Sequence, residues 1–232
     1  MMKEALNKCD CEKCDLKELF FKNVEDEMIE LVCNTKIENS FKQGEVIIEE
    51  GGSIESFIYL KSGLVKLFKP GLDEKGQIIM IAKPFDFVSL LSVFSDDKYN
   101  YSVTALEDSI TCNIKLGDIK KMIYTNGDFA LSIMKKMSRV SDMIILESLT
   151  LRKKNIHGRV AYILLFFADQ IYEDNYFELP LSRKEIAEFI GKTTENVIRT
   201  LSEFRKDGII KIFGKSIEII DKEKLKQVSD FG

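Results

Sequence analysis

Two amphipathic helical patterns meet across a very short break in residues 182–204, and this stretch constrains the chain more than any other. It reads SRKEIAEFIGKTTENVIRTLSEF. Ser182 and Glu185 have the spacing of a capping box, in which a hydroxyl and a carboxylate each satisfy a backbone N–H group. Gly191 supplies the left-handed conformation that ends a helix, and Thr193 offers a hydroxyl that starts the next one. The pattern predicts a helix-turn-helix.

The second of these helices has two distinct faces at about 100° per residue. Its apolar face consists of Val197, Leu201 and Phe204. Its opposite face carries polar side chains, namely Glu195, Arg199, Ser202 and Lys206. Such donors and acceptors suit base edges and phosphates in a major groove. The alternative is that Glu195 and Arg199 form an ordinary exposed ion pair, which would stabilise the helix by about 0.2–0.5 kcal/mol.

The flanking segments favour a DNA-binding domain. Arg159–Ile171 is a strongly apolar helical pattern, which we expect to form the first core helix. Ile209–Phe213 and Ser216–Ile220 have the pattern of two strands joined by Gly214 and Lys215. A helix, a helix-turn-helix and a hairpin in this order predict a winged helix. Lys215 would then meet a phosphate at the wing tip, or it would simply be a solvated turn residue.

The charge of the chain is uneven. The formal net charge is -4, which does not suit a protein that coats nucleic acid without specificity. Residues 181–216, however, contain 8 basic and 5 acidic residues, a net charge of +3. No apolar run is long enough to span a bilayer, and the polar N-terminus MMKEALNKCD has no signal segment. We therefore expect a cytoplasmic protein with no membrane contact.

Short apolar or alternating runs separated by glycine and proline occupy residues 35–116, and they have the texture of strands. The runs are Glu45–Ile48, Phe57–Leu60, Leu64–Phe68, Gln77–Ile81, Phe87–Leu91, Tyr101–Ala105 and Ile110–Ile114. Strands at this spacing predict a small antiparallel roll or barrel, a fold that often encloses one ligand cavity.

A longer helix is predicted from Asp128 to about Leu151. Ile133, Met137, Val140 and Ile144 follow one another in steps of four and three, as in a coiled-coil seam. A seam needs a partner, which favours a two-fold homodimer. The alternative is that the helix packs against the chain's own barrel. The residues that could serve such a second contact are Phe129, Leu131, Met134, Met143 and Ile145.

The chain has five cysteines, an odd number that argues against a disulfide framework. Cys9, Cys11 and Cys14 have the close spacing of thiolates that converge on a soft metal or an iron–sulfur cluster, although the spacing matches no single type of site. The alternative is a charged tail whose thiols are incidental. Cys33 ends an apolar pattern and is expected to be a small buried hydrophobic residue.

The order of these parts resembles the CRP/FNR superfamily of bacterial transcription factors, the cyclic-AMP receptor protein and fumarate-nitrate regulator type. The resemblance covers residues 16–232 and is most specific in Glu45–Gly63, in Phe85-Asp86-Phe87, in the long helix and in residues 182–219. It implies an α+β fold with a cyclic-nucleotide-binding-like β-roll, a long dimerisation helix and a C-terminal winged helix-turn-helix. The implied parts are a cysteine-bearing tail (1–15), the β-roll with flanking helices (16–126), the dimerisation helix (127–152) and the winged helix (153–232).

The resemblance implies a homodimeric, sequence-specific transcription regulator of double-stranded DNA with a palindromic operator. Glu195 and Arg199 match the family residues that read a C·G pair, in which Glu accepts from cytosine N4 and Arg donates to guanine O6 and N7. Thr194 stands where cyclic-AMP-type members have Arg, and Ile198 where fumarate-nitrate members have Ser, so the half-site should differ beside that pair. The expected DNA-contacting residues are Ser182, Arg183, Thr193, Thr194, Glu195, Asn196, Arg199, Ser202 and Lys215.

The effector implied by the resemblance is not cyclic AMP. Members that bind cyclic AMP use a Glu and an Arg where this chain has Leu90 and Tyr99, so a buried phosphate would lack its charge partner. Cys112 falls where oxygen-sensing members place the fourth ligand of an iron–sulfur cluster, which would join Cys9, Cys11 and Cys14. Because the N-terminal spacing departs from the family pattern, redox-active thiols, a zinc site or an inward strand residue at Cys112 remain open.

An effector or a redox signal would shift the long helix and thereby the spacing of the two reading helices. RNA polymerase is an expected partner, and the loop Tyr172–Glu178 is placed to face it by position alone. One rival hypothesis is a ligand-binding signalling module without DNA function. Another is a metal-dependent enzyme that uses the N-terminal cysteines and His157, but the sequence has no visible acid–base pair or nucleophile, so we expect no catalysis.

Overall fold

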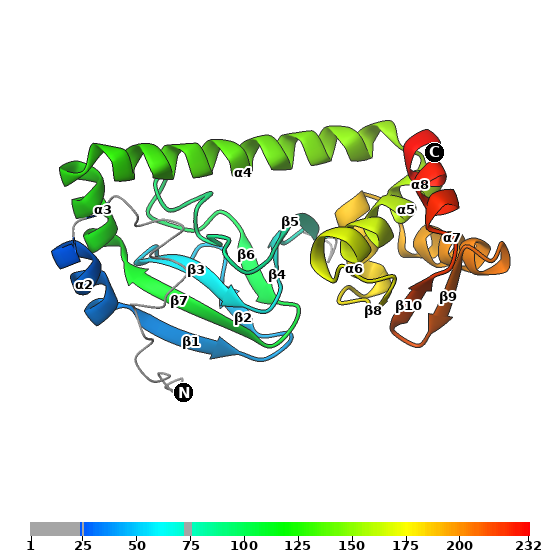
Figure 1. Ribbon diagram of the computed structural model, residues 1–232, viewed down its shortest axis with the longest axis horizontal. Coiled ribbons are helices and arrows are strands. Elements are labelled where there is room, and N and C mark those ends of the chain that lie inside the picture. The colour runs from blue at the N-terminus through cyan, green and yellow to red at the C-terminus, as the bar shows by residue number, and fades with distance from the viewer. Residues whose placement is uncertain (1–23, 25, 72–75) are drawn as a thin grey trace. The chain divides into compact units, whose positions relative to one another are not determined.

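The computed structural model describes residue 24, residues 26–71 and residues 76–232. The chain divides into two compact units (Figure 1), Met1–Pro70 with Ile79–Met143 and Gly71–Ile78 with Ile144–Gly232. The division falls within the long helix α4 (Gly127–Lys153). Each unit is described by itself below.

The first unit is built on two sheets. Its strands are β1 (Ile37–Phe41), β2 (Val46–Ile48), β3 (Ser56–Ser62), β4 (Val65–Lys69), β5 (Gln77–Ala82), β6 (Ser102–Ala105) and β7 (Ser109–Lys115). One sheet has the order β1-β7-β3 and the other β2-β6-β4-β5. Strand β7 pairs antiparallel with β1 and β3, and β6 pairs antiparallel with β2 and β4. Both sheets supply core residues at most 1% exposed, such as Phe57, Leu67, Val103 and Ile114.

Two parts of the strand prediction were wrong. Strand β1 was missed because its sequence, IENSF, contains too few apolar residues to stand out. The expected strand Phe87–Leu91 is instead a series of turns joined to β3, in which the Val88 N–H donates to the Ile58 carbonyl at 3.0 Å. The Ser89 hydroxyl oxygen accepts from the Ile58 N–H at 2.9 Å. These two bonds satisfy the N–H and C=O groups of Ile58 in β3 without a further strand.

Three helices flank these sheets: α2 (Asp26–Thr35), α3 (Leu116–Thr125) and the first part of α4. No helix in the described part of the chain is long and apolar enough to cross a membrane. On α4, Phe129, Ile133 and Val140 are 1%, 2% and 7% exposed. The Lys136 ammonium lies 3.3 Å from an Asp86 carboxylate oxygen and joins α4 to the segment between β5 and β6.

The burial of Ile133 and Val140 changes the interpretation of the predicted seam. Both residues are already covered within the single chain, so this stripe of α4 is largely an intrachain contact. Of the residues that were candidates for packing against the barrel, Phe129 is buried as expected. The assignment was wrong for the four others, since Leu131, Met134, Met143 and Ile145 are 45%, 56%, 45% and 55% exposed. A spacing of four and three is the same for a helix on a partner helix and for a helix on its own sheet, so the pattern alone does not distinguish them.

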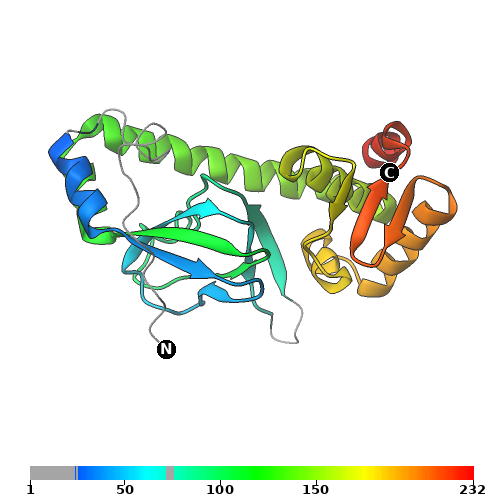
Figure 2. The same ribbon diagram turned by 60° about the horizontal axis from the view of Figure 1, so that its bottom comes forward.

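The second unit is a bundle of helices with a small sheet. Its elements are α5 (Ile156–Phe166), the π-helix η2 (Phe167–Ile171), β8 (Tyr176–Glu178), α6 (Arg183–Ile190), α7 (Thr194–Lys206), β9 (Ile210–Phe213), β10 (Ser216–Ile219) and α8 (Lys222–Phe231). The sheet has the order β8-β10-β9, and its strands lie side by side next to α7 (Figure 2). The hairpin is confirmed, whereas β8 lies in a segment expected to be a loop, and α8 was not predicted. The expected α+β architecture is confirmed as a whole.

Candidate nucleic-acid interface

The helix-turn-helix is built by the local interactions that the sequence predicts. The Ser182 hydroxyl oxygen accepts from the Glu185 N–H at 3.2 Å, and a Glu185 carboxylate oxygen accepts from the Ser182 N–H at 2.8 Å. Gly191 ends α6 in the left-handed conformation with φ 64°. The Thr193 hydroxyl oxygen then accepts from the Asn196 N–H at 3.4 Å and caps α7. The capping box, the glycine stop and the second cap are all confirmed.

Helix α7 has one buried, apolar side and one exposed, polar side. Val197, Leu201 and Phe204 are at most 2% exposed and anchor the helix in the core of the second unit. The expected outward residues Glu195, Arg199, Ser202 and Lys206 are all exposed. The helix therefore presents one acidic group, two basic groups and a hydroxyl that the fold itself does not bury.

Glu195 is held ionised at the start of α7. Hydrogen bonds from its own backbone N–H and from the Thr193 hydroxyl lower the pKa of the Glu195 carboxyl. An ionised carboxylate is an acceptor only, so it is matched to an amino group such as cytosine N4 and mismatched to a carbonyl oxygen.

Arg199 projects from the next turn of the same helix, and its side chain is 65% exposed. Its Nη2 donates to Asn196 Oδ1 at 3.2 Å, and its Nε lies 4.0 Å from Glu203 Oε1. The i,i+4 ion pair of Arg199 is thus made with Glu203 rather than with Glu195. Glu195 keeps its carboxylate for other partners, contrary to the alternative in which the two residues pair.

Glu203 and His157 are residues that the sequence analysis did not connect. His157 Nε2 lies 2.7 Å from Glu203 Oε2, so a side chain on α5 holds a side chain on α7. The i,i+4 spacing from Arg199 could have indicated Glu203, whereas the His157 contact joins residues 46 positions apart and no local rule indicates it.

The two expected phosphate contacts lie on separate elements. Arg183 is the first residue of α6 and is half-buried, and burial lowers the pKa of its guanidinium. Lys215 is exposed in the β9–β10 turn, beside Gly214 with φ 63°. Arg183 and Lys215 therefore supply two cations at different positions of the second unit.

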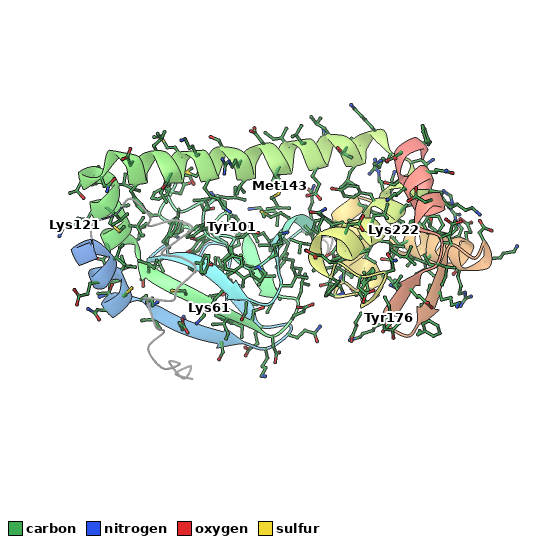
Figure 3. The ribbon with its side chains drawn as sticks, viewed as in Figure 1. Lys61, Tyr101, Lys121, Met143, Tyr176 and Lys222 are labelled. Carbon is green, nitrogen blue, oxygen red and sulfur yellow. The ribbon has the colours of Figure 1, made fainter. Side chains whose placement is uncertain are left out.

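The segment expected to hold an effector is apolar where a phosphate would need charge. Leu90 is 1% exposed and Tyr99 is 6% exposed. The Tyr99 hydroxyl donates to the Ser56 carbonyl at 3.3 Å, and burial raises its pKa to about 12. Tyr101, labelled in Figure 3, is 3% exposed and donates to the Val88 carbonyl at 2.8 Å. These phenols are neutral at ordinary pH and are no counterions for an anion.

The cysteines divide between described and undescribed residues. Cys112 is 2% exposed on β7, where it lies opposite Glu38 of β1 and Tyr59 of β3. Within the described ranges no three His, Cys, Asp or Glu residues are placed to hold a metal ion. Cys9, Cys11 and Cys14 lie outside those ranges, so the described part contributes one buried thiol to a cluster of the expected type. Such a thiol suits a ligand and an inward strand residue equally well.

The expectation for Cys33 was wrong. It is half-buried rather than buried, and it is disulfide-bonded. The odd number of cysteines excludes complete pairing but does not exclude a single bridge, which is why the count misled the prediction.

Comparisons with known proteins agree with this architecture. Residues 38–126 match the cyclic nucleotide-binding domain family, and residues 158–228 match the Crp-like helix-turn-helix domain family. Among solved structures, a transcriptional regulator of the crp/fnr family from Eubacterium rectale is similar with a TM-score of 0.78 and 18% identity, covering 90% of this chain and 97% of that one. FixK2 from Bradyrhizobium japonicum is similar with a TM-score of 0.74 and 23% identity, covering 84% and 97%. At these identities the structures establish the shared fold.

Curated relatives extend over nearly the whole chain. The transcriptional activator protein FnrA of Stutzerimonas stutzeri is 27% identical over 224 residues, which cover 94% of this chain and 91% of the relative. The fumarate and nitrate reduction regulatory protein of Escherichia coli strain K12 is 26% identical over 231 residues, which cover 94% and 90%. Together with the two domain families and the fold, these relatives place the chain in one family. The protein belongs to the CRP/FNR superfamily of DNA-binding transcription regulators.

Proposed function

We propose that the protein is a homodimeric regulator that reads a palindromic operator through α7 and is controlled by an effector or redox signal other than cyclic AMP. The observation that carries the proposal is that ionised Glu195 and exposed Arg199 lie one turn apart on the same side of α7 without pairing with each other. A carboxylate and a guanidinium in this relation match the amino group of cytosine and the O6 and N7 acceptors of guanine in one C·G pair. Arg183 and Lys215 then contact phosphates and fix the register.

The test of DNA reading begins with an operator selected from a random DNA library by the full-length protein. Affinity is then measured by fluorescence anisotropy at fixed salt. Arg199→Ala should weaken binding by about 1–3 kcal/mol and relax the preference at one base pair. Arg205→Ala removes the same charge from α7 outside the expected base-reading set and should leave base preference unchanged. Equal binding by the wild type and Arg199→Ala would favour the rival, a signalling module without DNA function.

The homodimer is supported by apolar residues that α4 leaves exposed. Leu131, Met134, Ile145 and Leu149 are 45%, 56%, 55% and 48% exposed on one side of α4, and Met143 and Leu146 of the same helix are exposed as well. Large apolar side chains that a helix leaves exposed in this number are typical of a protein interface. We therefore propose this face of α4, rather than the stripe with Ile133 and Val140, as the dimer contact.

The oligomeric state tests this assignment. Met134→Glu should shift the protein toward monomers in light scattering, because a buried carboxylate at the interface has no partner. Tyr124→Glu is the matched control, since Tyr124 is 85% exposed on α3 and its substitution should leave the dimer intact. A dimer that persists in Met134→Glu would place the interface elsewhere.

The signal remains to be identified, and we propose that it is not cyclic AMP. Leu90 and Tyr99 occupy the positions where the charge partners of a cyclic phosphate are expected, and both are buried. Equilibrium dialysis with labelled cyclic AMP should give no saturable binding at micromolar concentrations. Saturable binding there would contradict the proposal.

As the redox element we propose an iron–sulfur cluster held by Cys9, Cys11, Cys14 and Cys112. Such a cluster would supply a one-electron and oxygen-reactive centre, and the buried Cys112 thiol would be its ligand from β7. Protein purified without oxygen should contain iron and sulfide, and Cys112→Ser should reduce both. Cys33 is disulfide-bonded, so the proposed cluster requires that bridge to be reduced first. Cys33→Ser is the control, because it removes the bridge and should retain both iron and sulfide. Colourless, iron-free wild-type protein would exclude the cluster and leave zinc or redox-active thiols.

RNA polymerase is the partner proposed for the surface near β8. Tyr176, labelled in Figure 3, is 54% exposed on β8, while its neighbour Phe177 is buried and stacks on Tyr172 at 5.4 Å between ring centroids. Only the outward side chains of Tyr172–Glu178 are thus available to a partner. Tyr176→Ala should lower activated transcription in vitro and leave operator affinity unchanged. A parallel loss of affinity would contradict a polymerase contact.

A further inference from the structure

Ile198 is the one large apolar side chain of α7 that the fold does not bury. The helix contains four such residues, and Val197, Leu201 and Phe204 are at most 2% exposed. Ile198 is 50% exposed. It directly precedes Arg199 in the chain and follows Glu195 by three residues. An exposed apolar residue therefore lies between the two proposed base readers in the sequence and beside Glu195 on the helix surface.

The helical geometry places Ile198 on the edge of the same outward face. At about 100° per residue it lies roughly 60° from Glu195 and roughly 40° from Ser202 around the helix axis. The Ser202 hydroxyl donates to the Ile198 carbonyl oxygen at 2.9 Å, so its proton is used within the helix. Between Ile198 and Ser202 the helix thus offers a partner apolar surface and no free hydroxyl proton, whereas the next donor in this direction is Arg205, two turns further along the helix.

A major groove contains one apolar group that such a surface can recognise. Each base pair shows donors and acceptors there, and thymine alone adds a C5 methyl group. Isoleucine has no donor or acceptor, so it distinguishes base pairs only through contact with that methyl. Its β-branched side chain is also restricted at χ1, which lowers the entropy lost when it becomes ordered against a base.

We infer that Ile198 is a specificity-determining residue that contacts the methyl group of a thymine next to the C·G pair read by Glu195 and Arg199. The inference rests on the proposed DNA reading by α7. It predicts that the half-site contains a thymine next to the C·G pair. The thymine belongs to a neighbouring base pair because residues on adjacent turns of one helix cover more than one step of about 3.4 Å along the duplex.

Replacement of thymine by deoxyuracil tests the contact, because uracil lacks the methyl and keeps every polar group of the base edge. In the selected operator, each thymine beside the C·G pair is replaced symmetrically in both half-sites, and the dissociation constant is measured by anisotropy at fixed salt. The wild type should lose about four-fold in affinity per half-site at one of these positions, the effect of one buried methyl-sized group. Ile198→Val should retain this sensitivity, and Ile198→Ser should bind the thymine and uracil operators alike.

Ile220→Ser is the matched control, since Ile220 is 46% exposed beyond β10 and its loss should leave the uracil effect unchanged. The inference is overturned if uracil is tolerated at every position, if no thymine is selected beside the C·G pair, or if Ile198→Ser keeps the full sensitivity. Arg199→Ala, measured on the same operators, separates the two failures. If it loses its preference for the C·G pair while uracil has no effect, DNA reading stands and only the role of Ile198 is wrong. If it binds as the wild type does, the proposed function fails as well.

Discussion

His157 Nε2 and Glu203 Oε2 lie 2.7 Å apart and join α5 to α7. The other carboxylate oxygen of Glu203 lies 4.0 Å from Arg199 Nε. One carboxylate therefore links the first helix of the winged-helix unit to a proposed base reader. The His157 and Phe204 rings, with centroids 6.0 Å apart, pack beside this link. We therefore expect Glu203 to influence the proposed DNA reading through the position of Arg199.

Glu203→Ala should weaken operator binding by a few-fold, because Arg199 loses a partner that limits its conformations. The cost in unfolding free energy should be at most about 1 kcal/mol, since the side chains of His157 and Glu203 are 42% and 43% exposed and their attraction is screened. Anisotropy and urea unfolding measure the two effects. Glu223→Ala breaks a comparable surface pair with Lys226 and should leave operator affinity unchanged. A normal affinity in Glu203→Ala would exclude the positioning role.

Lys215→Ala tests the wing. A phosphate contact carries no sequence information, so the variant should lose affinity to a similar degree for all DNA sequences. The slope of log affinity against log salt concentration should also fall by about one per half-site contact. Lys211→Ala is a suitable comparison, because Lys211 is paired with Glu218 on the same hairpin at 3.7 Å. A change of base preference in Lys215→Ala would argue for direct base reading by the wing instead.

Gly191→Ala should destabilise the winged-helix unit. Gly191 has φ 64°, and an L-residue pays about 1–2 kcal/mol in that left-handed conformation. The nearest heavy atom to an added Cβ is a terminal guanidinium nitrogen of Arg159 at 3.8 Å, so backbone conformation rather than crowding sets the cost. Gly127→Ala is the control, because Gly127 has ordinary φ and open space around it. Urea midpoints should fall for Gly191→Ala and stay level or rise for Gly127→Ala.

Alkaline pH should destabilise the first unit. Burial raises the pKa of Tyr101 above its ordinary value near 10 and raises that of Tyr99 to about 12. As the pH rises above about 10, these phenols lose their protons more readily in the unfolded chain than in the folded one. The stability that the neutral phenols contribute is complete below that pH and declines above it. Urea midpoints between pH 8 and 11 should therefore decline at the upper end.

Tyr101→Phe should reduce this pH dependence, since it removes one of the titrating phenols. At pH 8 it should cost about 0.5–1.5 kcal/mol through the lost hydrogen bond to the Val88 carbonyl. Tyr124→Phe is the control, because it removes a phenol that is 85% exposed instead of a buried one. An unchanged pH profile in Tyr101→Phe would show that other groups govern alkaline unfolding.

The helix-turn-helix was predictable because its determinants are local. Ser182 with Glu185, Gly191 and Thr193 each act within one turn of the backbone, and all four act as the sequence indicates. The exposure of Glu195 and Arg199 follows from helical periodicity alone. Local rules of this kind do not depend on what the helix packs against.

The parts that could not be predicted depend on distant partners. Strand β1 is held by β7, about seventy residues away in the chain, and its own sequence has little apolar character. The segment at Phe87 joins β3 through one isolated bridge to Tyr59 rather than as a strand. The side of α4 that packs on the first unit depends on the surface that it meets there. The burial of Ile133 and the exposure of Met134 could therefore not be predicted from their spacing along the helix.

The two sides of α7 have a consequence for how operator preference changes over time. Val197, Leu201 and Phe204 hold the helix in place, and none of them faces outward. Thr194, Ile198 and Ser202 occupy positions whose replacement leaves that core intact. New target sites are therefore accessible by single substitutions without a penalty in folding, and regulators of this architecture can diverge in the genes they recognise while their scaffold stays constant.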